Sequence, residues 1–554
     1  MYVKNWPTTW LNYSLKYETS ASGFVDAFFE ANNFTVTTVY CLRQTYMHFL
    51  ASEPVRVLRK SSAPITSMGN TFMRAFFFLV TFLSMNHLCA DDRPNIIFLM
   101  TDDQNIRSLG CYGAPGVTTP NIDGLANDGI VFDRHYDTTA ICMASRATVM
   151  TGLLEYQHGV NFGTGMDGDG QMRNDDWSQS YPMLLQNAGY QTAFAGKFGF
   201  TIADGSKSGR YPEDDFDTWG GGGGQTSFIT ARNKSMKRYA QEYPHATRSY
   251  GAFGRDFIKE SAKHGKPFCL SISFKAPHRP VQPDPLYDEI YAGKTFPKPA
   301  NFGRKFGEHF SEQSRRGRQY QRFDDWHYND SYDDVMAKYY QLIYAVDVAV
   351  GMIRDAVKDS GIHHKTLIIF TSDNGYFCGA HGYGSKVLPY EESSRVPLII
   401  YDPRSLKKSD RCHSVTANID IAATILDAAL GKPTHKKGKS LLKHYDTSRT
   451  QGDRIIPLIN VWGPEQAFSL GFVKNQWKYI YWPYTGEGMK PTAEIYNLQE
   501  DPLELHNRIN DSAVKDIRLE LEEDYDNLVL EWQQHAIDRP HYKTATTLFF
   551  RKGP

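Results

Sequence analysis

The chain has 554 residues, and its 61 Lys and Arg residues are balanced by 62 Asp and Glu residues, giving a net charge of −1. This length is ample for a large buried core and exceeds the usual size of one domain. The balanced charge excludes a protein that binds nucleic acid by general electrostatic attraction, although it leaves room for a local cationic pocket.

The first predicted element is a signal peptide over residues 68–90. Arg74 supplies a short basic region, an apolar run extends from Ala75 to Met85, and the small residue Ala90 stands where a signal peptidase would cut. The run is too short for an ordinary membrane span. These features predict an exported protein, in the periplasm, outside the cell or in another secretory compartment, with no stable membrane span.

A signal peptide belongs at the start of a protein, yet residues 1–67 precede this one. One interpretation is that translation begins at Met68 or Met73, and that the upstream residues are an over-extended gene start with little structure. The alternative is a genuine extension followed by an internal membrane anchor. Peptide sequencing of the secreted protein separates the two, because a mature start near Asp91 supports only the first.

Three buried strands and the helices between them are predicted downstream. Continuous apolar runs occur at 96–100, 268–274 and 367–370, a pattern typical of strands buried on both faces of a parallel sheet. Helix-like segments lie between them, at 182–188 and 336–357. This order predicts an α/β sandwich with a mostly parallel central sheet.

Side chains that can bind a ligand follow each of the three runs. These are Asp102 and Asp103, then His278, then Asp373 and Asn374. Any one of them alone would be an ordinary residue of a strand-end loop. Because the carboxyl ends of parallel strands form the ligand crevice, their convergence predicts a polar site able to bind a metal.

Other segments have weaker signals. The glycine run 220–224 is too isolated for a dinucleotide fingerprint and is predicted to be a flexible loop, and 296–334 is predicted to be a long surface excursion. Further on, short alternating strands precede a helix over about 513–534. We expect a main domain over 91–445 and a smaller antiparallel α+β subdomain over 446–554.

The seven cysteines form no CxxC pair and no zinc-like spacing, although one or two disulfide bridges remain open. One of them, Cys142, begins the stretch "CMASRATVMTG". A lone cysteine is usually a small buried residue or half of a disulfide. The following Ser145 and Arg146 could simply open a helix, so the stretch gains meaning only from the motifs around it.

Six segments, taken in order, resemble the type I sulfatases, the formylglycine-dependent branch of the alkaline-phosphatase-like superfamily. They are "TDD" at 101–103, "CMASRATVMTG" at 142–152, "GK" at 196–197, "APH" at 276–278, "SDNG" at 372–375 and "HGYGSKVLPYEESSRVPLII" at 381–400. The resemblance covers about residues 94–540, and its most specific motif is C-x-[PA]-S-R. It implies an alkaline-phosphatase-like sandwich, with 91–445 as the catalytic domain of a sulfuric ester hydrolase.

The resemblance implies that Cys142 is the precursor of the nucleophile. In the family a maturase oxidises this cysteine to formylglycine (3-oxoalanine), whose aldehyde hydrates to a diol. One diol oxygen attacks sulfur, and the second hydroxyl then drives elimination of sulfate. Ser145 and Arg146 match the residues that the maturase recognises, and Arg146 also steadies the modified side chain. Ala144 stands where proline is commoner, a known variant that bears on which maturase acts.

The resemblance also implies a metal site. The family's calcium ligands match Asp102, Asp103, Asp373 and Asn374, with the modified Cys142 side chain completing the set. These side chains supply oxygen only, which suits a hard cation such as Ca²⁺, or less favourably Mg²⁺. The ion would hold the diol oxygen and the sulfate oxygens together and offset charge in the transition state.

Three further residues match family positions around the sulfate. Lys197 and Lys386 match lysines that contact the sulfate and the leaving group, and His278 matches a histidine that contacts the sulfate or protonates the departing alcohol. Fixed cations in a dry pocket stabilise spread negative charge, and histidine transfers protons near neutral pH.

One position departs from the family pattern. The family commonly reads G-K-W-H, whereas this chain reads "GKFGF", so Gly199 stands where a histidine is usual. Either the contact is absent, or His381 or His158 supplies it. This departure leaves the identity of the general acid open.

The predicted function is an exported sulfatase that acts on a sulfated carbohydrate. The carbohydrate is inferred from residues 204–329, a long insertion rich in Arg, Tyr and Trp. One alternative is a phosphodiesterase or phosphonate hydrolase of the same superfamily. Another is an inactive glycan-binding relative, which only Gly199 supports. No nucleic-acid partner is expected.

Overall fold

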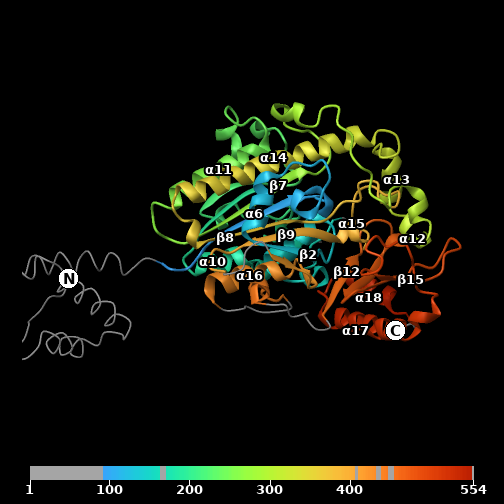
Figure 1. The fold of residues 1–554 in the computed structure, drawn as a ribbon. Coiled ribbons are helices and arrows are strands. Elements are labelled where there is room, and N and C mark those ends of the chain that lie inside the picture. The colour runs from blue at the N-terminus through green and yellow to red at the C-terminus, as the bar shows by residue number, and fades with distance from the viewer. Residues whose placement is uncertain (1–90, 163–169, 406–409, 432–437, 447–453, 552–554) are drawn as a thin grey trace, which may run out of the picture. The chain divides into compact units, whose positions relative to one another are not determined.

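The computed structural model describes residues 91–162, 170–405, 410–431, 438–446 and 454–551 (Figure 1). The predicted signal peptide over 68–90 and the segment 1–67 lie outside these residues. None of the helices in the described ranges combines the length and the apolarity that a membrane crossing requires.

A nine-stranded, mostly parallel sheet forms the centre of the fold, as the sequence predicts. Its strand order is β10-β2-β9-β8-β1-β7-β4-β6, with β11 paired to β2. The strands are β1 Asn95–Asp102, β2 Ile130–Tyr136, β4 Gln191–Lys197, β6 Thr218–Gly222, β7 Phe268–Pro277, β8 Thr366–Ser372, β9 Arg395–Tyr401, β10 Asp410–Cys412 and β11 Thr416–Ala417. Strand β9 is antiparallel to both of its neighbours, β2 and β8. A separate small pair joins β3 (Gln171–Met172) and β5 (Thr201–Ile202).

Helices cover both faces of this sheet (Figure 1). One face carries α6 (Pro120–Asp128), α11 (Ala246–Ser261) and α14 (Tyr332–Asp359), and the other carries α7 (Cys142–Thr151), α10 (Tyr181–Asn187) and α16 (Asp420–Leu430). Every residue of β1 is buried, because Ile97 and Leu99 enter the core under the first group and Ile96, Phe98 and Met100 enter the core under the second. The unbroken apolar run in the sequence therefore reflects burial on two faces. The helices predicted at 336–357 and 182–188 correspond to α14 and α10.

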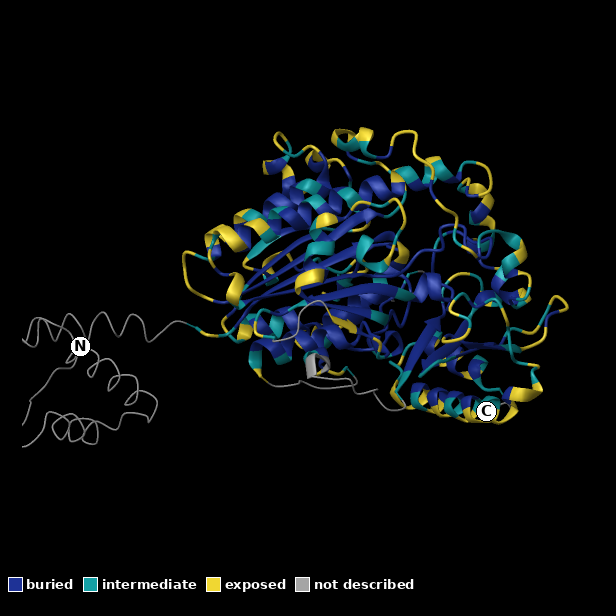
Figure 2. Cartoon of the chain, in the orientation of Figure 1, coloured by how far each residue is buried: buried dark blue, intermediate teal, exposed yellow. Residues whose placement is uncertain are grey.

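A second, antiparallel sheet follows in the C-terminal part. It is the meander β12-β13-β14-β15 (Ile455–Asn460, Ser469–Lys474, Trp477–Trp482 and Thr492–Asn497), packed against α17 (Lys515–His535) and α18 (Pro540–Phe549). Large aromatic residues such as Trp482, Tyr525 and Trp532 fill its core. The strands of both sheets are buried, while the outer faces of α11, α14 and α17 are exposed (Figure 2).

The glycine run 220–224 is only in part the loop that the sequence predicts, because residues 220–222 belong to the edge strand β6 and residues 223–224 follow it in a turn. A Cβ on Gly220 would lie 2.7 Å from Phe253 Cε2 and 2.9 Å from Met236 Sδ. Glycine is therefore required here because α11, which carries Phe253, packs closely onto the strand, and not because the backbone must bend.

The predicted surface excursion 296–334 contains two short helices, α12 (Glu312–Arg315) and α13 (Arg318–Asp325). Helix α13 lies against the loop that precedes Lys386: the Gly384 amide donates to the Gln319 carbonyl at 2.9 Å. A Cβ on Gly384 would lie 2.7 Å from the Arg322 carbonyl oxygen, so glycine permits this approach.

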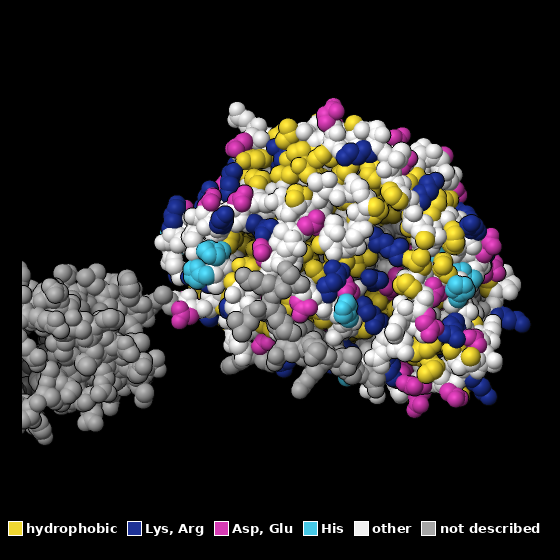
Figure 3. All heavy atoms as spheres, viewed as in Figure 1, with side chains coloured by type: hydrophobic (Ala, Val, Ile, Leu, Met, Phe, Trp, Pro, Cys, Tyr) yellow, Lys and Arg dark blue, Asp and Glu magenta, His cyan; other side chains and the backbone are white. Residues whose placement is uncertain are grey.

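The remaining short helices are α8 (Glu155–His158), α9 (Asn174–Ser178) and α15 (Glu391–Ser394). Basic and acidic side chains are interspersed on the face shown in Figure 3.

Candidate active site

Polar side chains from three parallel strands meet at one edge of the central sheet. Asp102 is the last residue of β1, Lys197 is the last residue of β4, and Asp373 directly follows β8. Asp103 turns the chain out of β1 with a φ of 68°, a left-handed conformation that aspartate tolerates better than most side chains. Asn374 is joined to this turn, since its Nδ2 donates to Asp103 Oδ1 at 2.8 Å.

Arg146 lies at the centre of the group and is completely buried. Its Nε donates to Asp373 Oδ2 at 2.8 Å, and its Nη2 lies 2.8 Å from the same oxygen and 3.3 Å from Asp102 Oδ2. Its Nη1 donates to the Lys197 carbonyl at 2.6 Å and to Ser273 Oγ at 2.8 Å. One guanidinium thus joins β1, β4, β7 and β8 through charge-assisted hydrogen bonds.

Gly199 is explained by the same guanidinium. A Cβ at this position would lie 2.5 Å from Arg146 Cδ, and Gly199 has a φ of +95°, in the left-handed region that favours glycine. A histidine side chain at residue 199 would displace Arg146 from its present place. The close packing of Arg146 against the backbone at Gly199 therefore explains why this chain has glycine where the family usually has histidine.

The two histidines considered as replacements make their contacts elsewhere. His158 Nε2 lies 3.1 Å from Thr148 Oγ1, and its Nδ1 accepts from a backbone amide. Burial lowers the pKa of His158 to about 3. His381 Nδ1 lies 2.8 Å from the Phe306 carbonyl and its Nε2 lies 2.8 Å from Asn301 Nδ2. In the described ranges neither ring forms a hydrogen bond or ion pair with the side chains of Cys142, Lys197 or Lys386.

Cys142 is the first residue of α7 and is buried. Its Sγ lies 2.8 Å from Lys386 Nζ, which also binds Asp103 Oδ1. Burial raises the pKa of the Cys142 thiol to about 11, and the charge of Asp102 adds to this effect. The unmodified side chain is therefore a neutral thiol at physiological pH and a poor nucleophile.

Cations surround the first aspartate of the group. Lys197 Nζ lies 2.5 Å from Asp102 Oδ2, and Lys386 Nζ lies 3.7 Å from its Oδ1. Burial alone would raise the pKa of Asp102, but Lys197, His278, Lys386 and Arg146 outweigh it and hold the pKa well below its ordinary value. The site therefore keeps this buried carboxylate ionised.

His278 lies at the open side of the group. It follows the end of β7, its Nε2 is 3.8 Å from Asp103 Oδ2, and its Nδ1 contacts the Arg279 carbonyl. Its side chain is 18% exposed, compared with 4% for Asp103. Burial lowers the pKa of His278. Substrate would therefore reach the site from the His278 side.

The residues fit a bound cation. One donor atom from each of four residues, Asp102, Asp103, Cys142 and His278, lies within 4.8 Å of the others. Asp102 Oδ1 and Asn374 Oδ1 are buried and lack a hydrogen-bond partner in the described structure. Such orphaned oxygens are uncommon in proteins, and they complete a donor set rich in oxygen that suits a hard divalent ion.

Sequence reasoning missed residues that support α7. Ser273 accepts a hydrogen bond from Arg146 in the middle of β7. The apolar pattern of this strand in the sequence does not indicate that one of its serines contacts the site. Asp137 is buried, accepts from Asn418 Nδ2 at 2.5 Å, and has its pKa raised well above the ordinary value by burial. Asn418 Nδ2 also lies 3.5 Å from Ser145 Oγ, which places Ser145 behind the site rather than in it.

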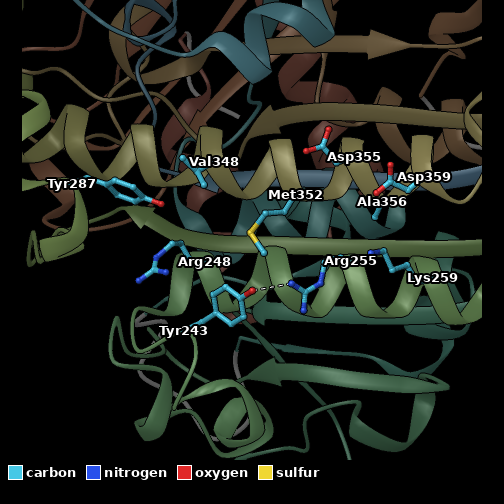
Figure 4. A pocket seen from close by; sticks show the side chains of 10 residues that line it. All are labelled: Tyr243, Arg248, Arg255, Lys259, Tyr287, Val348, Met352, Asp355, Ala356 and Asp359. Atoms are coloured by element: carbon cyan, nitrogen blue, oxygen red, sulfur yellow. Dashed lines mark hydrogen bonds between the residues drawn. The ribbon is translucent and has the colours of Figure 1, made fainter.

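A cavity of about 350 Å³ lies away from this group, between α11 and α14 (Figure 4). Helix α11 contributes Arg248, Arg255 and Lys259 to its lining, and α14 contributes Asp355 and Asp359. None of the residues around Cys142 lines it. This cavity is therefore separate from the group at the strand ends.

Comparisons with known proteins agree with this geometry. The family model described as sulfatase matches residues 94–432, and a model described as the C-terminal part of N-sulphoglucosamine sulphohydrolase matches 379–531. An N-acetylglucosamine-6-O-sulfatase of Bacteroides thetaiotaomicron is 30% identical over 416 residues, which cover 63% of this chain and 70% of that protein.

Solved structures share the fold. One, in complex with its substrate D-glucosamine-2-N,6-O-disulfate, is 25% identical with a TM-score of 0.66, over 81% of this chain and 99% of that chain. The phosphonate monoester hydrolase of Agrobacterium radiobacter has a TM-score of 0.61 at 21% identity, over 80% of this chain and 96% of that chain. The second comparison shows a common fold only.

Proposed function

The chain belongs to the sulfatase family, whose members hydrolyse sulfate esters, and we propose that it acts on a sulfated carbohydrate through a formylglycine made from Cys142. The observation that carries the proposal is the position of Cys142 Sγ, 2.8 Å from Lys386 Nζ at the amino end of α7. In the modified residue, one oxygen of the diol would occupy the position that Sγ has here. A cation and a helix amino terminus both favour an oxyanion at that place.

The proposed first step transfers the sulfuryl group to this oxygen. The diol oxygen loses its proton and attacks sulfur, and the bond between sulfur and the sugar oxygen breaks. Lys197 and Lys386 stabilise the negative charge on the sulfate oxygens in a pocket that excludes water. Arg146 keeps Asp102 and Asp373 in place through its guanidinium.

The departing sugar oxygen needs a proton. His278 is the residue we assign to this task, because it lies at the open side of the site where the sugar must sit. Burial lowers the pKa of His278, whereas a sulfate monoanion bound next to the ring would favour the protonated imidazole. In the second step the other diol hydroxyl loses its proton, the carbon–oxygen double bond re-forms, and sulfate leaves.

A divalent ion, which we take to be Ca²⁺, would be held by the oxygens of Asp102, Asp103, Asp373 and Asn374. When bound, it would supply Lewis-acid stabilisation of charge on the sulfate. The four side chains come from the ends of β1 and β8, so the pairing of these two strands holds the two halves of the donor set together.

The carbohydrate is supported by the relatives. The N-acetylglucosamine-6-O-sulfatase and the neighbour that binds a disulfated glucosamine both act on amino sugars by their printed names. We extend this chemistry to the present chain and propose a sulfated hexosamine as the substrate. The apolar segment at 68–90 supports export, which would bring the enzyme to extracellular glycans.

The test is release of sulfate from hexosamine 6-O-sulfate by protein produced together with a maturase. The proposal expects turnover of the sugar sulfate, and turnover restricted to aryl or alkyl sulfates would refute the carbohydrate assignment. The fold is shared with a phosphonate monoester hydrolase, so the same preparation should be assayed on a phosphonate monoester and a phosphate diester. Faster turnover of either than of any sulfate ester would favour that alternative.

A further inference from the structure

Three arginines lie over two indole rings near the open side of the site. Arg279 directly follows His278, and its Cζ is 4.6 Å from the centre of the Trp326 ring. Arg322 Cζ is 5.0 Å from the same ring, and Arg318 Cζ is 5.0 Å from the ring of Trp462. Arg318 and Arg322 are four residues apart on α13, so they lie on the same face of that helix.

Both indole rings are tied to residues next to the reaction centre. Trp326 stacks on Tyr376 at 6.1 Å, Tyr376 stacks on Tyr339 at 5.9 Å, and the Tyr339 hydroxyl donates to the Asp103 carbonyl at 2.7 Å. This row of rings connects Arg279 and Arg322 to the Asp103 turn.

Trp462 is connected to the centre through a different set of residues. With Phe162 it packs against a small apolar cluster formed by Ile141, Ala144 and Val387. Ile141 and Val387 are the chain neighbours of Cys142 and Lys386 respectively. Because α13 is held on the loop before Lys386, Arg318 reaches the ring of Trp462 and Arg322 reaches the ring of Trp326.

Among the residues that the structure describes, two of these guanidinium groups have no anionic partner, whereas Arg322 Nη1 lies 3.4 Å from Asp325 Oδ2. Within the described ranges, neither Arg279 nor Arg318 forms an ion pair or donates a hydrogen bond from its side chain. Arg279 is nevertheless half-buried. In contrast, Arg316 lies just before α13 and pairs with Glu312 at 3.0 Å and with Glu487 at 3.8 Å. An indole ring fixes the plane of a guanidinium while leaving its N–H groups free for a ligand.

The groove between α11 and α14 does not offer the same chemistry, although it also contains three cations. Arg248 pairs with Asp284 at 2.5 Å and Arg255 pairs with Asp256 at 2.8 Å. The facing helix adds Asp355 and Asp359 to the lining (Figure 4). Anion binding is therefore favoured at the three arginines over the indole rings and not in this groove.

We propose that Arg279 and Arg322, over Trp326, and Arg318, over Trp462, bind further anionic groups of the substrate, each a sulfate or a carboxylate on the sugar whose sulfate ester is cleaved or on the next sugar. The proposal rests on the carbohydrate substrate proposed above and narrows it to polyanionic saccharides. A planar guanidinium binds the paired oxygens of a sulfate or a carboxylate with two parallel hydrogen bonds. The expected substrate therefore carries at least two negative groups.

The experiment compares a hexosamine with one sulfate and the same hexosamine with two sulfates, using protein produced with a maturase. Wild-type enzyme should prefer the disulfated sugar in kcat/KM by about tenfold or more, the effect of one charge-assisted hydrogen bond pair. Arg279→Ala should remove most of this preference by raising KM for the disulfated sugar. Arg316→Ala, a matched change of an already paired arginine, should keep the preference.

A preference below about twofold in the wild type, or an equal loss on both sugars in Arg279→Ala, would overturn the proposal. Circular dichroism and thermal unfolding identify a variant that has not folded, in which case Arg322→Gln and Arg279→Lys replace it. The lysine keeps the charge without the planar fork, so it should recover part of the preference.

Binding to the inactive Cys142→Ala protein separates failure of this proposal from failure of the proposed function. Calorimetry should give tighter binding of the disulfated than of the monosulfated sugar, with the difference lost in Cys142→Ala/Arg279→Ala. Equal binding of both sugars would reject the subsite even where hydrolysis is observed. Selective binding without hydrolysis by the wild type would instead retain the subsite and reject the proposed reaction.

Discussion

Two buried groups of charged residues can be compared in this molecule. The first surrounds Cys142 and contains Asp102, Asp103, Asp373, Arg146, Lys197 and Lys386. The second, which we call the inter-sheet cluster, joins α15 to the C-terminal sheet and consists of Glu391, Glu392, Glu504, Lys478 and Arg395. Each has three carboxylates, but the first has three cations and the second has two. The first opens to solvent at His278, whereas Lys478 and Glu504 of the second are completely buried.

The inter-sheet cluster reduces its own charge. Lys478 Nζ lies 2.9 Å from Glu391 Oε1 and 2.7 Å from Glu504 Oε1. Burial opposes ionisation of Glu391, but Lys478 and Arg395 outweigh it and bring its pKa to about 2. Burial raises the pKa of Glu504 to about 8. At neutral pH one of the two glutamates that share Lys478 is ionised and the other is neutral, which satisfies the requirement that a closed cluster hold little net charge.

The Cys142 group shows a similar division, because its cations keep Asp102 ionised despite complete burial, whereas burial and the charge of Asp102 raise the pKa of Asp373. It differs from the inter-sheet cluster in its third cation and in its opening to solvent at His278. A site that must receive an anion and a divalent ion needs ionised ligands and fixed cations before either arrives. The comparison indicates that the open group is organised for ligands and the closed group for joining two sheets. Substitutions should therefore affect turnover in the first and stability in the second.

The largest effect is expected from Cys142→Ala. This change removes the nucleophile, so kcat for sulfate-ester hydrolysis should fall by at least about 10³-fold. The midpoint of thermal unfolding should stay within a few degrees of the wild type, because alanine fits a helix amino terminus. Residual turnover above one tenth of the wild type would show that Cys142 is not the nucleophile.

Removal of divalent ions should have the next largest effect. Dialysis against a chelator should lower kcat/KM by about 10²-fold, since a metal supplies several kcal/mol of stabilisation to a developing charge. Added Ca²⁺ should restore activity more completely than added Mg²⁺. Elemental analysis gives the molar ratio of metal to protein. Full activity at a ratio well below one would contradict the assignment of Asp102, Asp103, Asp373 and Asn374 as ligands.

Lys478→Met tests the closed group. The change leaves Glu391 buried without its nearest cation, and we expect a loss of about 3 kcal/mol in the free energy of unfolding. Denaturation by urea measures this loss, while kcat per folded molecule should remain within twofold of the wild type. A variant with wild-type stability and impaired kcat would show that the inter-sheet cluster affects catalysis. The two groups would then not have separate roles.

The last prediction concerns pH. Glu504 has a folded-state pKa of about 8, above its ordinary value, so the folded protein binds the extra proton between these values. Its contribution to stability is complete below pH 4 and is lost as the pH rises through 8. Between pH 5 and pH 8 the free energy of unfolding should fall by about 2 to 4 kcal/mol from this group.

Glu504→Gln should flatten this dependence, since glutamine imitates the neutral form at every pH. Glu520→Gln, a change of an exposed glutamate, serves as the control and should leave the slope unchanged. Urea denaturation at pH 5, 6.5 and 8 measures all three proteins. An identical slope in wild type and Glu504→Gln would place the titration on another residue.

The sequence predicted the central sheet and the residues at its strand ends, because both follow a local pattern. Apolar runs such as 96–100 mark strands buried on two faces, and the ligand-type residues that follow them meet because parallel strands end at one edge. The motif around Cys142 supplied the rest of the candidate site by resemblance. These predictions depend on local pattern or on a short motif, and either can be read from one segment of chain.

The inter-sheet cluster could not be predicted in this way. Lys478 and Glu504 belong to the C-terminal sheet and its following loop, and Glu391 lies far earlier in the chain, so no local pattern pairs them. The prediction of a loop was wrong at Gly220 for a related reason, because the contact that requires glycine there comes from Phe253 on a distant helix. Gly199 likewise acquires its meaning only from Arg146. Contacts between remote segments decide such positions.

The most direct test of the central claim is a mass spectrum of the peptide that contains Cys142, recorded on protein produced with and without a maturase and paired with kcat for each preparation. The mechanism predicts the mass of the aldehyde or its hydrate, and kcat proportional to the modified fraction. Equal turnover by a preparation in which residue 142 remains entirely a thiol would contradict it.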